Sequence, residues 1–161
     1  MRDNTINPAV LLEVLSMATG NAFGTQPESA DGSTDDIEDE LEPILEQITA
    51  TLELEDLTFE ETIIKQNLDE LLLMLIVLHE STHGDELLTE IAESFDVRLS
   101  PGTLYPRLHD LEEQGVLSMH TKVRTKEYSI ADHDDAQKRL EAAVVQHLAF
   151  GMLLYASLEQ L

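Results

Sequence analysis

The order of apolar patterns between residues 67 and 131 limits the fold more than any other feature of this sequence. Three helical patterns follow one another at residues 67–79, 83–95 and 100–114, and two runs with partial alternation follow at 116–123 and 125–131. Each helical pattern keeps its apolar residues on one face: Leu68, Leu71, Leu72 and Leu75; then Leu87, Leu88, Ile91 and Phe95; then Leu104, Leu108 and Leu111. The sequence therefore predicts three amphipathic helices and a β-hairpin that turns near residues 122–125.

Local signals mark the ends of these helices. Asn67 and Glu70 have the spacing of a capping box ahead of the first helix. Ser100 followed by Pro101 predicts the start of the third helix, because Ser is a favoured N-cap and Pro fits the first helical position. Gly115 predicts the end of the third helix, since glycine readily takes the left-handed conformation found there.

The segment 132–161 has the pattern of one long helix. The stretch LAFGMLLYA at 148–156 is apolar on all sides, and little chain remains to cover it, so we expect a second copy to do so. The predicted dimer interface follows a heptad-like seam: Val144, Leu148, Gly151, Met152, Tyr155 and Leu158. Three helices, a hairpin and a terminal helix predict a mainly α winged helix-turn-helix domain with a small β-hairpin wing and a dimerisation helix.

Residues 1–66 carry weaker signals. The sequence predicts an N-terminal amphipathic helix within residues 1–19 and a flexible acidic linker at 20–36, where Gly, Ser and Asp are frequent. Residues 37–66 are predicted to form a helical N-terminal extension, with an uncertain start because of Pro43. We expect the winged-helix domain at 67–131 and the dimerisation helix at 132–161. The extension could embrace the terminal helix or recruit another protein, and both readings stay open.

The same region resembles a known family. THGDELLTEIAESF, LSPGTLYPRLHDLEEQGVL and VRTKEYSIA are similar to the DNA-binding domain of the PadR family, whose members carry an HGYE-like turn, an SPGTLYP recognition segment and an R-x-K-x-Y wing motif. The resemblance implies a transcriptional regulator, with repression as the default output and activation open. Asp85 stands where the family commonly has Tyr. The chain also has no Trp, which ligand-binding members use for stacking, and we expect no cofactor.

The stretch HESTH at 79–83 matches the H-E-x-x-H signature of zinc metallohydrolases. That site needs one unbroken helix, which places both His side chains on a common face and a Glu beside the metal-bound water. Here Ser81, Thr82 and Gly84 stand where the first helix should stop, and Thr82 with Asp85 resembles the cap of the next helix. No third His follows at the metzincin spacing. We therefore expect no metal site and no enzyme.

Basic residues concentrate where a winged helix meets DNA. Residues 98–126 hold five Lys and Arg against three acidic residues, in a chain whose formal net charge is −24. The expected DNA-binding residues are Ser100, Thr103, Tyr105, Arg107, Lys122, Arg124 and Lys126. Thr103 and Arg107 are predicted to lie opposite the core stripe and to reach bases and phosphates. Tyr105 has two readings, as a phosphate-contacting hydroxyl or as a packed ring.

These assignments lead to a specific mode of action and to one alternative. We expect a homodimer that places two recognition helices in successive major grooves of double-stranded DNA and favours an inverted repeat. At the wing, Arg124 and Lys126 are expected to reach the backbone or the minor groove. The alternative is a winged-helix module for protein contacts without DNA binding. Acids on the recognition face of the folded domain would favour that alternative.

The charge balance predicts the solvent in which the chain works. Its 33 acidic residues against 9 basic ones, with no Cys, are similar to the composition of haloarchaeal proteins, in which carboxylates keep the chain hydrated at molar salt. No export signal or spanning run is apparent, so we expect a cytoplasmic protein with no membrane contact. At about 1 M salt the Debye length is about 3 Å and counterion release is weak, which predicts a shallow or reversed salt dependence of DNA affinity.

Overall fold

The computed structural model describes residues 41–161 except 53, 54, 56 and 159. The helix predicted within residues 1–19 and the linker predicted at 20–36 lie outside the described residues. The chain divides into two compact units, residues 1–58 and residues 59–161, and each is described by itself.

Helix α2, Leu41–Thr51, lies in the first unit, within the predicted helical extension. Pro43 stands in its first turn, where backbone N–H groups have no intrahelical acceptor, so the missing donor of proline is tolerated there. Toward the other end, the Thr49 hydroxyl donates to the Leu45 carbonyl over 2.7 Å.

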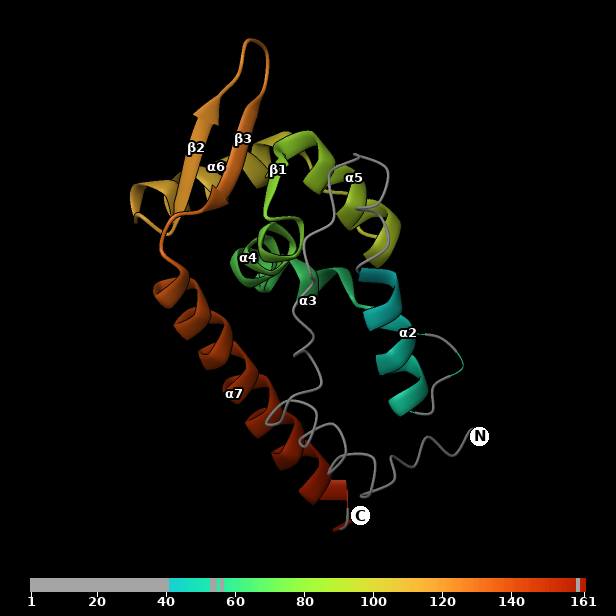
Figure 1. Cartoon of the computed structure of the whole chain (residues 1–161). Coiled ribbons are helices and arrows are strands. Elements are labelled where there is room, and N and C mark those ends of the chain that lie inside the picture. Colours follow the sequence, from blue (N-terminus) through green and yellow to red (C-terminus); the bar gives the residue numbers. More distant parts are fainter. Residues whose placement is uncertain (1–40, 53–54, 56, 159) are drawn as a thin grey trace. The chain divides into compact units, whose positions relative to one another are not determined.

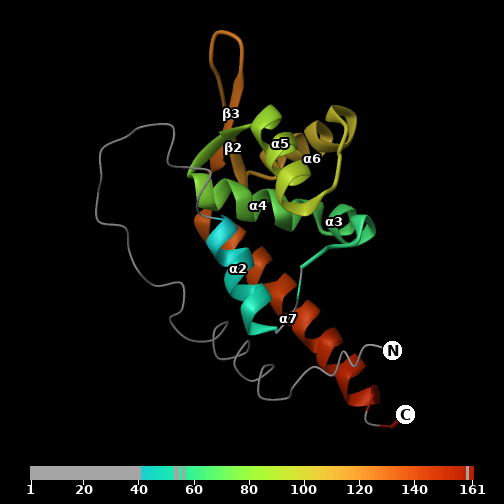
Figure 2. The same cartoon turned by 90° about the vertical axis from the view of Figure 1, so that its right-hand side faces the viewer.

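The second unit is a winged helix-turn-helix domain that continues into a long helix, as predicted. Its elements are α3 (Glu61–Gln66), α4 (Leu68–His79), β1 (Ser81–His83), α5 (Gly84–Phe95), α6 (Pro101–Glu113), β2 (Leu117–Thr121), β3 (Lys126–Ile130) and α7 (His133–Leu158). Figures 1 and 2 show the β2–β3 hairpin projecting from one side of the helices and α7 running away on the other.

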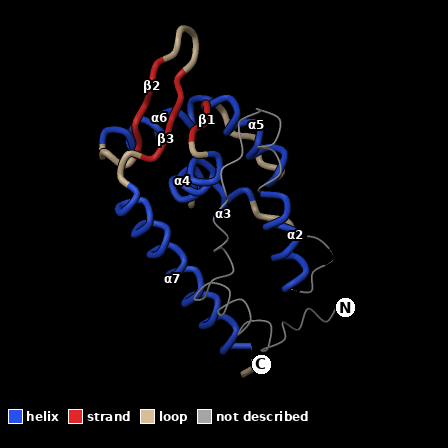
Figure 3. The backbone as a smooth tube through the Cα atoms, in the orientation of Figure 1, coloured by secondary structure: helices blue, strands red, loops and turns tan. Residues whose placement is uncertain are grey.

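The sheet has one strand more than the sequence predicts. β3 lies in the centre, with β2 on one edge and β1 on the other, all antiparallel (Figure 3). In the predicted hairpin, Leu117 pairs with Ile130 and Thr121 with Lys126. The added strand pairs Ser81 with Ser129 and His83 with Glu127. The wing is therefore joined to the segment between α4 and α5.

The HESTH stretch spans a helix end and this added strand. His79 is the last residue of α4, and Glu80 follows with a φ of 59°, a conformation that a non-glycine residue adopts only at a cost and that stops the helix. Ser81 to His83 then form β1. The prediction that His79 and His83 lie on different elements is confirmed.

Two of the predicted helix caps are wrong in detail. Asn67 forms no capping box with Glu70, because its side-chain amide instead donates to the Ile63 carbonyl over 2.8 Å, at the end of α3. The cap of α5 uses Glu86, whose carboxylate accepts the His83 backbone N–H over 2.9 Å, rather than the predicted pair of Thr82 and Asp85.

The start and the end of α6 follow the prediction. Ser100 is the N-cap residue, and Pro101 is the first residue of the helix. At the other end, Gly115 has a φ of 77°, which glycine adopts without the steric cost that a Cβ would bring.

The predicted apolar stripes meet in one core. The fully buried side chains are contributed by all three helices and by the residue before β2: Leu68, Leu72, Leu73, Leu75 and Ile76; Leu87 and Ile91; Leu104, Leu108 and Leu111; and Val116. The rings of Phe59 and Phe95 pack with their centroids 5.4 Å apart and their planes tilted by 60°. Leu88, predicted to face inward, is half-buried. The core thus holds α6 and the sheet in a fixed relation.

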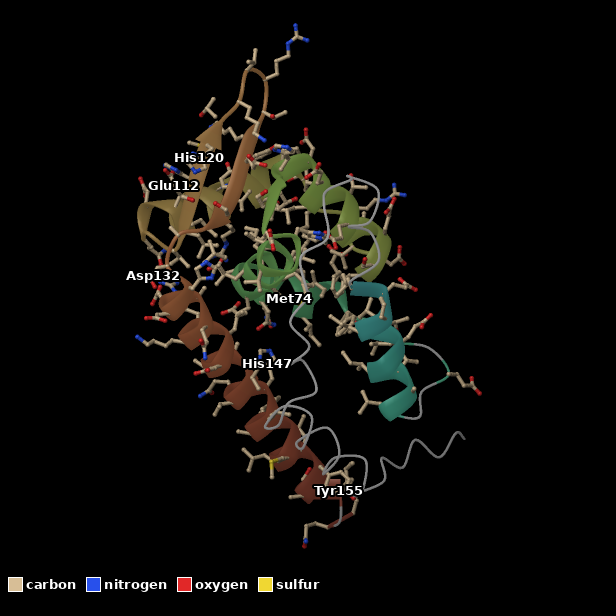
Figure 4. The ribbon with its side chains drawn as sticks, viewed as in Figure 1. Met74, Glu112, His120, Asp132, His147 and Tyr155 are labelled. Carbon is tan, nitrogen blue, oxygen red and sulfur yellow. The ribbon has the colours of Figure 1, made fainter. Side chains whose placement is uncertain are left out.

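Helix α7 contacts the core only near its start. Ala136 is buried, and the Arg139 guanidinium donates to the Gln114 side-chain oxygen over 2.9 Å and to Asp135 over 2.8 Å. Beyond these turns, Val145, Phe150 and Leu153 are 61%, 64% and 70% exposed. Tyr155 lies near the far end of the helix (Figure 4). The later part of α7 therefore presents apolar side chains without cover from the described residues.

Candidate nucleic-acid interface

The first turn of α6 presents small polar groups to solvent. Ser100 and Thr103 are both exposed, and their hydroxyl oxygens lie 3.0 Å apart, within hydrogen-bond distance. No acidic side chain occurs in this turn. Hydroxyl groups in such a position can donate to or accept from base edges and phosphate oxygens.

Tyr105 packs against the start of α5. A Cβ on Gly84 would lie 2.6 Å from ring atom Cε1 and from the hydroxyl oxygen, so only glycine leaves room for the ring. The hydroxyl donates to Asp85 Oδ1 over 3.2 Å. Desolvation, followed by the Asp85 charge, raises the pKa of Tyr105 above its usual value, which keeps the hydroxyl protonated. The structure contains the packed ring, and the phosphate contact of the hydroxyl stays a prediction.

Arg107 lies beside the core stripe rather than opposite it. Its Nη1 is 3.4 Å from Asp69 Oδ2 on α4, and Gln114, the residue that follows α6, accepts a hydrogen bond from Arg139 of α7. The predicted placement of Arg107 and Gln114 opposite the core is wrong, because the residues at positions 107 and 114 lie about 60° to 80° around the helix from Leu104. Arg107 stays partly exposed.

Asp69, the partner of Arg107, is an unusual carboxylate. Burial raises the pKa of Asp69 and outweighs the opposing effect of the Arg107 charge. Its Oδ1 is buried and has no hydrogen-bond partner among the described residues. The pair between Asp69 and Arg107 therefore joins α4 to α6, but it leaves one of the two carboxylate oxygens without a hydrogen bond from the described residues.

The wing tip carries basic side chains in two different states. Lys122 Nζ lies 2.8 Å from Glu127 Oε2, and this bond lowers the pKa of the Glu127 carboxyl. Arg124 and Lys126 are exposed, and within the described ranges their side chains make no hydrogen bond or ion pair. The turn itself is closed by the Lys122 N–H, which donates to the Thr125 carbonyl over 2.8 Å. Two positive charges are thus free to meet an external anion.

A pocket of about 410 Å³ connects these parts of the domain. It is lined by residues from β1, α5, α6 and the wing: His83, Gly84, Asp85, Tyr105, Arg124, Thr125 and Lys126. Three predicted DNA-binding residues, Tyr105, Arg124 and Lys126, therefore share one surface. Sequence reasoning missed His83, Gly84, Asp85 and Thr125, although the departure of Asp85 from the PadR pattern marks this place.

The two His residues of HESTH have separate structural partners. His79 Nε2 lies 2.7 and 2.9 Å from the two carboxylate oxygens of Glu90 on α5. His83 Nδ1 lies 3.2 Å from the Lys126 carbonyl oxygen. In the part of the chain that the structure describes, no group of three His, Cys, Asp or Glu residues is placed to hold a metal ion.

The predicted dimer seam runs along the uncovered part of α7. Val144, Gly151, Met152 and Leu158 are exposed, while Leu148 and Tyr155 are half-buried. By length and composition, α7 is also the one helix in the described residues that could cross a membrane, which is weak support for a spanning role. Its first turns carry Asp134, Asp135, Lys138 and Arg139, so only the later turns are apolar.

Comparison with known proteins finds similarity between this domain and transcription regulators. Residues 72–137 match the family described as the transcriptional regulator PadR-like family. The transcriptional activator GvpE1 of Halobacterium salinarum is 37% identical over 99 residues, which cover 62% of this chain and 52% of that protein. The transcriptional activator GvpE of Haloferax mediterranei is 40% identical over 89 residues, 55% of this chain and 46% of that protein. The chain spans about half the length of these relatives.

Solved structures support the fold at lower identity. A PadR family transcriptional regulator from Eggerthella lenta superposes with a TM-score of 0.52 and 20% identity, covering 74% of this chain and 96% of that one. A transcriptional regulator from Clostridium thermocellum gives a TM-score of 0.50 and 18% identity, covering 59% of this chain and 97% of that one.

Proposed function

We propose that the chain regulates transcription by binding double-stranded DNA, a proposal supported by the match of residues 72–137 to the PadR-like family. The observation that carries the proposal is the pair of exposed side chains of Arg124 and Lys126 on the wing, which have no partner among the described residues and lie beside the acid-free first turn of α6. In a chain of net charge −24, this surface is suited to phosphate.

Each predicted DNA-binding residue has a proposed part in this contact. Ser100 and Thr103 face the major groove from the first turn of α6, and the wing residues Arg124 and Lys126 bind the backbone or the minor groove. Tyr105 shapes the surface through its packing on Gly84. Lys122 and Arg107 contribute less, because each already pairs with a carboxylate, Glu127 and Asp69 respectively.

We propose that α7 pairs two copies of the chain along the seam from Val144 to Leu158. Its later turns expose more apolar side chain than a monomer in water normally leaves uncovered. The two recognition helices would then meet successive major grooves about 34 to 36 Å apart on an inverted repeat. We also propose that residues 1–66 can bind another protein.

The direction of regulation is proposed to be activation. Family resemblance makes repression the default, but the relatives from Halobacterium salinarum and Haloferax mediterranei are both named transcriptional activators. A haloarchaeal-type, cytoplasmic setting agrees with the composition and with these relatives, and no catalytic activity is proposed.

DNA binding is tested by mapping bound genomic sites in cells at native salt, with Arg124→Ala and Lys126→Ala as variants. We expect defined sites for the unchanged chain and at least a tenfold loss of occupancy for the double variant, since each phosphate contact contributes separately. Lys138→Ala on α7 is the matched control, because Lys138 is exposed and loses the same charge outside the wing. Equal losses in the control and the wing variants would overturn this assignment.

One observation keeps the protein-contact alternative in view. The last two turns of α6 carry Asp110, Glu112 and Glu113, and His109 lies 3.3 Å from both glutamates. This acidic half of the helix suits a basic protein surface better than DNA. A chain that occupies no DNA in the mapping experiment, yet recovers basic transcription proteins through α6, would support this alternative.

A further inference from the structure

The pocket between α5, α6 and the wing mixes charges of opposite sign. Arg124 and Lys126 line it from the wing, and Asp85 lines it from the first turn of α5. Asp85 is exposed and accepts a hydrogen bond from the neutral Tyr105 hydroxyl over 3.2 Å. No cation among the described side chains pairs with it. The Asp85 charge is therefore left for an external partner.

The Asp85 carboxylate weakens the attraction of this pocket for a DNA phosphate unless a further positive charge enters. A phosphate held by Arg124 and Lys126 would share the pocket with the Asp85 carboxylate, and like charges in one pocket repel. A pocket of about 410 Å³ has room for roughly a dozen waters at about 30 Å³ each, so it can hold a phosphate and a partly hydrated ion together.

We propose that the pocket takes up one monovalent cation together with a DNA backbone phosphate, with the Asp85 carboxylate and the Tyr105 hydroxyl oxygen as its protein ligands. The inference rests on the proposed DNA binding. Hard cations of this kind prefer carboxylate, hydroxyl and phosphate oxygens. Asp85 and Tyr105 provide the first two in the pocket, and the bound DNA would provide the third. The Tyr105 hydrogen is directed to Asp85, which leaves lone pairs of its oxygen for the ion.

Cation uptake changes how affinity depends on salt. DNA binding normally releases cations, so log K falls as log [salt] rises, with a slope of about −0.9 per phosphate neutralised. Each cation that binds with the complex changes the slope by about one in the opposite direction. Asp85 would thus give this chain part of the shallow salt dependence that its composition predicts.

The test uses the full chain and a duplex that the chain selects from a random-sequence pool at molar KCl. Affinity is measured from about 0.1 M to about 1 M KCl for the unchanged chain and for Asp85→Asn. We expect the variant to bind at least tenfold more tightly at the low end and to show a slope more negative by about one throughout. Glu93→Gln, an exposed acid on α5 outside the pocket, is the control and should keep the original slope.

A change of cation separates ion uptake from screening. Tetramethylammonium chloride provides the same ionic strength, but its methyl groups prevent the ion from binding oxygen ligands closely. We expect it to weaken DNA binding by the unchanged chain several-fold relative to KCl and to leave Asp85→Asn unaffected.

Two outcomes would overturn the inference in different ways. In the first, the slopes of the unchanged chain and of Asp85→Asn converge at molar salt, and the unchanged chain binds equally well in KCl and in tetramethylammonium chloride. DNA binding would then stand, but Asp85 would only repel the phosphate and would bind no cation. A chain that selects no duplex at any salt concentration would refute the proposed function, and the ion site with it.

Discussion

At the scale of single residues, the contact between Gly84 and Tyr105 decides the shape of the candidate interface. The ring occupies the space of the missing Cβ and brings its hydroxyl to Asp85. The family-like THG and SPGTLY stretches, separated by about fifteen residues, are therefore interlocked in space. Neither stretch alone predicts this contact, because it depends on the packing of α5 against α6.

Gly84→Ala is expected to lower the free energy of unfolding by about 1 to 2 kcal/mol, because the added Cβ overlaps the Tyr105 ring. Denaturant unfolding measures this change. In a Tyr105→Ala background the same substitution should cost much less. Gly102→Ala is the control, since its Cβ would come no closer than 3.7 Å to another group. Equal costs in both backgrounds would contradict the proposed overlap.

Asp69 leads to a prediction about pH. Burial raises the pKa of this carboxyl in the folded chain above its unfolded value. The protonated form therefore favours folding, and stability from this group is present below the unfolded pKa and is lost as pH rises through the folded pKa. Asp69→Asn, which cannot ionise, should increase the free energy of unfolding at neutral pH and leave it unchanged at acid pH.

Chemical denaturation of Asp69→Asn across pH measures this effect, with Glu93→Gln as a control for the loss of one negative charge. A variant equally stabilised at every pH would show that the ionisation of Asp69 is not the cause. Destabilisation at neutral pH would show that the pair with Arg107 outweighs burial.

At the scale of elements, β1 is the strand that sequence reasoning missed. Its three residues are too few to show alternation, and its pairing with β3 joins positions more than forty residues apart, from Ser81 to Ser129. By contrast, α6 was predicted with correct ends, because Ser100, Pro101 and Gly115 carry local conformational preferences. Cap partners were less predictable: Asn67 caps the end of α3, a short helix without a sequence signal of its own.

A charged residue substituted into the predicted dimer seam is expected to weaken the pairing of two α7 helices. Val144→Glu should raise the dissociation constant of a homodimer at least tenfold, since two valines lose burial contributing about 1.5 to 3 kcal/mol each. Sedimentation equilibrium at molar KCl measures it. Gln146→Glu, an exposed polar position on the same helix, is the control. A chain that is monomeric before substitution, or that partitions into lipid vesicles, would contradict the pairing of α7.

At the scale of the whole molecule, charge sets the conditions for folding. A net charge of −24 on 161 residues favours expansion through self-repulsion, and salt screens that repulsion. We expect the Tm to rise by several degrees between about 0.1 M and about 1 M KCl. Thermal unfolding followed by circular dichroism checks this. A Tm that stays level or falls as KCl is added would contradict the interpretation that the acidic composition is an adaptation to molar salt.

The whole fold was more predictable than the site within it. Apolar periodicity in residues 67–131 is enough to identify the core, because it marks one buried face on each helix. Leu72, Leu104 and Leu108, which lie on these faces, are fully buried in the structure. The site depends on side chains that compete for partners. Lys122 and Arg124 look equivalent in the sequence, yet Lys122 is bonded to Glu127, while Arg124 has no partner within the described residues. Which basic side chain pairs with a carboxylate depends on three-dimensional packing, so the sequence pattern alone does not predict it.

The short strand β1 also makes the wing part of a mechanical linkage. Because β3 is bonded along both edges, the hairpin cannot swing as a free flap hinged at its base. A displacement of the wing tip would be transmitted by β3 to Ser81–His83, and from these residues to the first turn of α5. Three of the five letters that imitate a zinc signature, Ser81–His83, thus connect the wing to the start of α5.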